Sequence, residues 1–97
     1  MPRKRSDLPP LIKRMERAKH LQGVEVAREL VEIARHPDAD VLTIDEYAVL
    51  IRQYAGGMSV SEIAAEFGLF GRNGDISRFA SSGIRKLRKI QQGEYVQ

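Results

Sequence analysis

The 97-residue sequence contains no cysteine, which excludes a disulfide framework and every zinc module built on cysteine ligands. Its only strong neutral metal ligands are His20 and His36, and no third ligand is spaced to join them. We therefore expect the protein to use no metal and no other cofactor.

Long apolar runs and catalytic motifs are also missing. No run approaches the roughly 18 residues of a membrane helix, and the opening MPRKRSDLPP lacks the apolar segment of a secretory signal. No glycine-rich phosphate loop follows a strand, and no set of Ser, His and Asp shares a credible location. We therefore expect a cytoplasmic protein, associated with the nucleoid, that has no membrane partner and is not an enzyme.

Charge is plentiful but unevenly distributed. The 16 basic and 13 acidic residues give a formal net charge of +3. Residues 1–20 hold seven basic and two acidic residues, residues 21–68 hold three and nine, and residues 69–97 hold six and two. Two basic ends around an acidic middle indicate a scaffold that carries surfaces for a polyanion.

Every strong periodic signal is helical, so we expect an all-α fold: a small bundle of about five helices forming a single domain over residues 10–97. Residues 1–9 form a basic arm that we expect to be flexible. A minor-groove arm and a localisation signal are the alternative interpretations of this segment.

Two helices are expected in the first third of the chain. Pro10 suits a helix start, and one apolar stripe follows on Leu11, Ile12, Met15 and Ala18. Beyond Gly23 the stripe turns by roughly 120°, which favours a second helix over 23–35 rather than one long bent helix. The second helix has a broad apolar face, with candidate dimer-interface residues Val24, Ala27, Leu30 and Val31. The alternative, that this helix closes the core of the monomer, stays open.

The segment RHPDAD predicts a turn, and two capping boxes follow it. Thr43 and Glu46 open a helix that ends at Gly56, with an apolar face on Ile44, Tyr47, Ala48, Ile51, Tyr54 and Ala55. Ser59 and Glu62 open a helix of barely two turns, with an apolar face on Val60, Ile63, Ala64 and Phe67. A helix this short needs tertiary packing to be stable.

The last helix is expected to begin between Asn73 and Asp75, with either residue as its cap, and to run to about Gln91. Its inner stripe comprises Ile76, Phe79, Ala80, Gly83, Ile84, Leu87 and Ile90. Its outer face comprises Arg78, Ser81, Ser82, Arg85 and Lys89. A scaffold helix, a glycine turn, a short capped helix, a second turn and a basic helix are the layout of a helix-turn-helix, here at about 43–91.

The segment LTIDEYAVLIRQYAGGMSVSEIAAEFGL, followed by DISRFASSGIRKL, resembles the four-helix helix-turn-helix of LuxR-type regulators and of region 4 of bacterial sigma factors. Those families share an L-T-x-x-E opening, a glycine before the short helix, an E-I-A core and a closing R-K-L. The resemblance covers about residues 42–90, and it implies a domain that binds double-stranded DNA. The turn LFGRNG is about two residues longer than the usual turn of these families.

The resemblance also implies roles for individual residues. Ile76 takes the buried position at the start of the recognition helix. The implied base-contacting residues are Arg72, Asn73, Asp75, Ser77, Arg78 and Ser81. The implied phosphate-contacting residues are Ser59, Ser61, Arg85 and Lys89.

Together these features predict sequence-specific binding of double-stranded DNA by a small bacterial or phage transcription regulator. Because this class of protein usually binds paired half-sites, we expect a homodimer. One alternative is a sigma-like interaction module that docks on RNA polymerase through the acidic middle of the chain. Another is a phage accessory protein for DNA packaging or replication.

Overall fold

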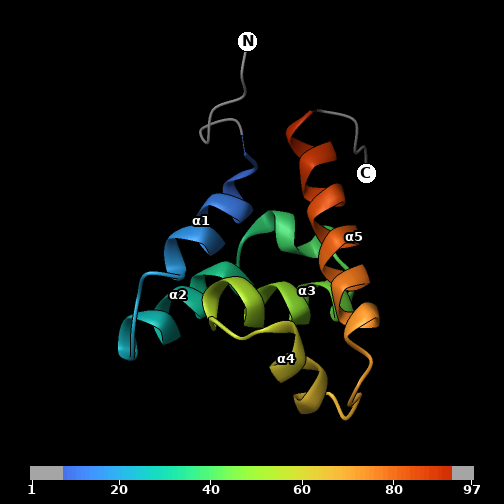
Figure 1. The fold of residues 1–97 in the computed structure, drawn as a ribbon. Coiled ribbons are helices and arrows are strands. Elements are labelled where there is room, and N and C mark those ends of the chain that lie inside the picture. The colour runs from blue at the N-terminus through green and yellow to red at the C-terminus, as the bar shows by residue number, and fades with distance from the viewer. Residues whose placement is uncertain (1–7, 93–97) are drawn as a thin grey trace.

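The computed structural model describes residues 8–92, and every regular element in this range is a helix (Figure 1). In chain order the elements are α1 (Pro10–Ala18), α2 (Val24–Ala34), the 3₁₀ turn η2 (Pro37–Val41), α3 (Ile44–Leu50), the π-helical turn η3 (Ile51–Ala55), α4 (Val60–Glu66) and α5 (Asn73–Gln91). The predicted all-α bundle is therefore confirmed.

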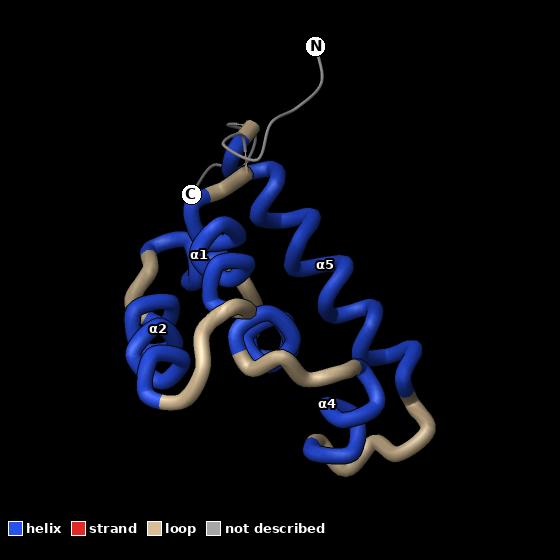
Figure 2. The backbone as a smooth tube through the Cα atoms, turned by 60° about the vertical axis from the view of Figure 1, so that its left-hand side comes forward, coloured by secondary structure: helices blue, strands red, loops and turns tan. Residues whose placement is uncertain are grey.

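The helices pack in two halves joined by α3. Figure 2 shows α1 and α2 on one side of the molecule and α5 on the other, with α4 at the end from which α5 starts. The core has two clusters: Leu50 packs with α1, α2 and Leu87 of α5, whereas Val49 packs with Ile63 of α4 and Ile76 of α5. Two adjacent residues of α3 thus connect the N-terminal helices to the α4–α5 pair.

The N-terminal region forms two separate helices, as predicted. Gly23 separates them with a φ angle of 62°, a conformation that side-chain-bearing residues rarely adopt. Pro9 is fully buried and Leu8 packs against the first cluster, so the packed domain includes two residues that we assigned to the flexible arm. The remaining arm prediction, for residues 1–7, lies outside the described residues.

The broad apolar face of α2 is used only in part. Ile33 is its one fully buried residue, and Leu30 packs half-buried against the first cluster. Val24 and Val31 remain 70% and 50% exposed. The monomer core therefore accounts for one edge of this face and leaves the rest in contact with solvent.

The predicted apolar face over residues 44–55 was wrong in part. Ala55 is buried, and Tyr47, Ile51 and Tyr54 pack against the first cluster, as predicted. Ile44, however, is 87% exposed, and Val49 and Leu50, which we did not assign to the face, are completely buried. Val49 and Leu50 belong to two different clusters, so α3 is buried on more than one side. The helical period also changes after Leu50, in the π-helical turn where the Gly56 N–H donates to the Ile51 carbonyl, five residues back, at 3.0 Å. A helical wheel drawn at one α period across residues 44–55 therefore averages two different phases.

Helix α5 approaches α3 closely at Gly83. A Cβ atom placed on Gly83 would lie 2.6 Å from Cδ1 of the fully buried Leu50. The missing side chain is what permits this approach, since core packing leaves little room for displacement. Gly83 therefore helps to fix the position of α5 on the scaffold.

Candidate nucleic-acid interface

The outward face of α5 carries a line of cations. Arg78, Arg85 and Lys89 are exposed, and the side chain of Arg78 is 82% accessible. Arg85 and Lys89 make no ion pair with any residue from 8 to 92. Charges left unpaired on one helix face are available to an external polyanion.

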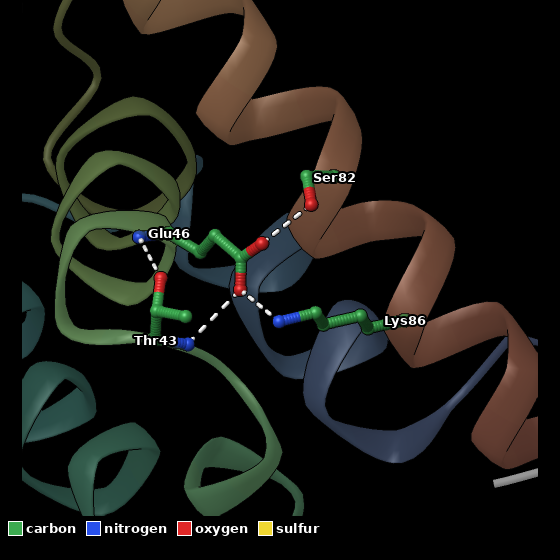
Figure 3. A network of polar contacts seen from close by, with 4 residues as sticks. All are labelled: Thr43, Glu46, Ser82 and Lys86. Atoms are coloured by element: carbon green, nitrogen blue, oxygen red, sulfur yellow. Dashed lines mark hydrogen bonds and ion pairs between the residues drawn. The ribbon is translucent and has the colours of Figure 1, made fainter.

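The flank of α5 nearest α3 is held by a partly buried polar network centred on Glu46 (Figure 3). The capping box forms as predicted: the Thr43 N–H donates to Oε1 of Glu46 at 2.9 Å, and the Glu46 N–H donates to Oγ1 of Thr43 at 3.2 Å. From α5, the Lys86 ammonium donates to the same Oε1 at 2.8 Å, and the Ser82 hydroxyl donates to Oε2 at 2.5 Å. One carboxylate thus joins the start of α3 to the middle of α5.

The environment of Glu46 favours its ionised form. Burial alone would raise the pKa of its carboxyl group, but the hydrogen bonds from Lys86, Ser82 and Thr43, with the charge of Lys86, outweigh burial and lower the pKa from 4.5 to about 2. Glu46 is only 5% exposed, so the ion pair lies largely out of water. An internal charge of this kind needs nearly complete hydrogen bonding, and here it has it.

The contacts of Ser82 and Lys86 with Glu46 were not predicted from the sequence. We placed Ser82 on the outer basic face, yet it is half-buried and bonded to Glu46. On the helical wheel, residue 82 lies at the border between the outer and inner faces, so periodicity alone does not assign it. The spacing of four residues between Ser82 and Lys86 could have indicated a shared contact, because it places the two side chains on one flank of the helix.

Three of the predicted base-contacting residues form a cluster at the start of α5. Arg72 Nε lies 2.8 Å from one carboxylate oxygen of Asp75, and Arg78 Nη2 lies 3.8 Å from the other. Both guanidinium groups remain mostly exposed, at 64% and 82% of the side chain. Asp75 therefore orients two arginines and still leaves the cluster with a net positive charge.

The predicted cap of α5 was wrong. Arg72 occupies the N-cap position and makes no capping bond with its side chain. Asn73 Nδ2 instead donates to Oγ of Ser61 at 2.9 Å, and Asp75 lies inside the first turn, where a carboxylate is favoured by the helix dipole. The Asn73 side chain thus ties the start of α5 to α4.

The predicted phosphate contacts on α4 are less available than those on α5. The second capping box forms as predicted, with the Ser59 N–H donating to Oε1 of Glu62 at 2.9 Å and the Glu62 N–H donating to Oγ of Ser59 at 3.2 Å. These hydrogen bonds lower the pKa of Glu62, so an anion already occupies this helix start. The hydroxyl of Ser61 accepts from Asn73.

The remaining exposed residues near the start of α5 include one aromatic ring that we had not singled out. Ser77 and Ser81 are exposed, as their predicted contacts with bases require. Phe70, in the turn before α5, is 77% exposed, while the adjacent Leu69 packs against the second cluster.

Within residues 8–92, no helix is long and apolar enough to span a membrane, and no three candidate ligand side chains come together to hold a metal ion. Comparisons of the chain with protein-family models, with curated proteins and with solved structures find no match. Functional assignment therefore depends on the chemistry of the surfaces described above.

Proposed function

We propose that the protein binds double-stranded DNA as a helix-turn-helix in which α4 and α5 are the two helices and α5 enters the major groove. The observation that carries this proposal is the line of exposed cations on α5, two of which have no ion-pair partner within residues 8–92. The resemblance of residues 42–90 to regulator domains supports the same assignment.

The position of each cation along α5 suggests its role. Arg78 lies in the second turn of the helix, where a guanidinium can reach the edge of a guanine. Arg85 and Lys89 lie roughly 10 and 16 Å further along the axis, at 1.5 Å per residue. At that distance the helix leaves the groove, so these two residues contact backbone phosphates.

Paired affinity measurements test this assignment. Arg78→Ala should weaken binding to a selected cognate site by about 1–3 kcal/mol and change binding to random DNA little, whereas Arg85→Ala should weaken both alike. The matched control is Arg28→Ala, because Arg28 is exposed on α2 and makes no ion pair with residues 8–92. Equal losses for Arg28 and Arg85 would contradict a DNA face on α5.

In more detail, we propose that the protein is a transcription regulator that dimerises through α2 and binds DNA as this homodimer. Its exposed apolar residues Val24, Ala27, Val31 and Ala34 alternate at spacings of three and four, the pattern of a helix–helix seam. Val31→Glu should give a folded monomer when the wild type is a dimer, measured by sedimentation equilibrium. Leu30 is unsuitable for this test, because it also packs against the monomer core.

Docking on RNA polymerase through the acidic middle is less well supported. Glu29 pairs with Arg14 at 2.5 Å, Glu66 pairs with Arg52 at 2.5 Å, and Glu46 pairs with Lys86 at 2.8 Å. Glu29 and Glu46 are therefore paired with cations from outside the acidic middle and are less available to a partner protein. A packaging or replication accessory protein would use the same α5 face, and it would show no preference for selected DNA over random DNA.

A further inference from the structure

A groove on the other flank of α5 has features of a small-molecule site. It has a volume of about 440 Å³, within the range of ligand pockets, and it lies between η3 and α5. Gln53 and Tyr54 line it from η3, and Ser81, Arg85 and Arg88 line it from α5. Ala80 and Ile84 add apolar surface.

The local backbone is unusual at this groove. Gln53 and Tyr54 belong to the π-helical turn Ile51–Ala55. Such turns are rare and occur often at functional sites, because the extra residue redirects neighbouring side chains. The π-helical turn therefore lines the groove, and it does not include Leu50, which makes the close contact with Gly83.

Gln53 carries an unsatisfied hydrogen-bond acceptor. Its Oε1 is buried and has no hydrogen-bond partner among the described residues. A buried acceptor without a donor costs about 1–3 kcal/mol. The last torsion of a glutamine side chain is soft, so a small rotation of the amide can offer this oxygen to a donor in the groove.

The groove also has unpaired positive charge. Arg85 and Arg88 make no ion pair with any described residue, in contrast to Lys86 on the same helix. Guanidinium groups bind phosphate with two parallel hydrogen bonds. The groove therefore combines a phosphate-binding end with an acceptor that needs an N–H donor.

We propose that this groove binds a small phosphorylated ligand that carries an amine, the chemistry of an adenine nucleotide. The phosphate contacts Arg85 and Arg88, and the exocyclic amine donates to Gln53, a pairing that glutamine side chains make with adenine. The proposal does not depend on DNA binding. Because Arg85 also belongs to the proposed DNA face, a bound nucleotide would compete with DNA for this residue.

The first test is a titration of the DNA-free protein, followed by two-dimensional NMR of backbone and side-chain amides. Adenosine monophosphate should give saturable shifts at Gln53, Ser81 and Arg88, and should bind more tightly than inosine monophosphate, which lacks the amine. Inorganic phosphate should bind more weakly than either nucleotide. Absence of saturable shifts, or equal affinity for all three probes, would overturn the proposal.

Two variants test which residues contact the phosphate and the amine of the ligand. Arg88→Ala should weaken adenosine monophosphate binding about tenfold, as loss of a charge-assisted contact predicts, while Arg28→Ala leaves it unchanged. Gln53→Met should abolish the preference for adenosine over inosine monophosphate. It should also leave the melting temperature unchanged or higher, because it removes the unsatisfied oxygen. A lower melting temperature with the preference retained would make Gln53 a structural residue and contradict its proposed role.

Discussion

The two capping boxes of this protein have the same local geometry and different roles. In each, the N-cap backbone N–H donates to the glutamate at 2.9 Å and the glutamate N–H donates to the N-cap hydroxyl at 3.2 Å. Glu46 is nevertheless buried and bonded to two residues of α5, whereas Glu62 is exposed and its described bonds are confined to its own helix start.

The difference shows that a local motif can serve as a tertiary link. The first box lies where α3 crosses α5 beside Gly83, so its carboxylate meets Ser82 and Lys86. The second lies at the edge of the molecule on a helix of seven residues. We therefore assign the positioning of α5 to Glu46, and only the start of α4 to Glu62.

The largest expected effect comes from neutralising Glu46. Gln can still accept the bond of a capping box, so Glu46→Gln removes the charge while keeping the local motif. It leaves Lys86 without its ion-pair partner and should lower the free energy of unfolding by about 2–3 kcal/mol. Urea denaturation measures this change.

Glu62→Gln is the matched control for this prediction, because it makes the same substitution in the exposed box. We expect little change in its urea midpoint. The double variant Glu46→Gln/Lys86→Met should recover part of the lost stability, since it also removes the unpaired cation. Equal midpoints for the two single glutamine variants would contradict the difference between the boxes.

Lowering the pH should also distinguish the two capping boxes. The pKa of Glu46 is lower in the folded protein, at about 2, than its ordinary value of 4.5. Its contribution, on the order of 3 kcal/mol, is therefore complete above about pH 5 and is lost as the pH falls toward 2. The pH dependence of the urea midpoint should flatten over this window in Glu46→Gln and change much less in Glu62→Gln, because the carboxyl group of Glu62 is exposed. A wild-type midpoint that does not fall in this window would contradict the low pKa.

A smaller effect is expected from Ser82. Ser82→Ala removes one donor to the Glu46 carboxylate and should lower the free energy of unfolding by about 1–2 kcal/mol. It should also shift the acid transition to higher pH, because one bond that lowers the pKa of Glu46 is lost. The neighbouring Ser81→Ala is the control, since Ser81 is exposed. Indistinguishable melting curves for the two variants would show that the Ser82 bond adds nothing in solution.

The sequence predicted local features better than the contacts between helices. Both capping boxes, the break at Gly23 and the inner stripe of α5 through Ile76, Gly83 and Leu87 were predicted and are confirmed. The capping boxes and the break at Gly23 follow from local backbone chemistry. The stripe of α5 follows from one uninterrupted helical period.

The features that the sequence did not predict depend on a change of helical period or on a partner residue far away in the chain. Burial of Val49 and Leu50 was missed because these residues of α3 face two different clusters, and no residue pattern predicted the π-helical turn that follows them. Lys86 was assigned no role from the sequence, because its partner Glu46 lies 40 residues away in the chain. The unsatisfied oxygen of Gln53 was not predicted either, since its burial depends on tertiary packing.

The salt dependence of binding to a short duplex of mixed sequence tests the central claim most directly. Counterion release predicts that the logarithm of affinity falls linearly with the logarithm of salt concentration, with a slope of about 0.9 per phosphate contact. The double variant Arg85→Ala/Lys89→Ala should lower this slope by about two relative to wild type, while Arg28→Ala leaves it unchanged. An unchanged slope in the double variant, or no measurable binding by the wild type at low salt, would contradict a DNA interface on α5.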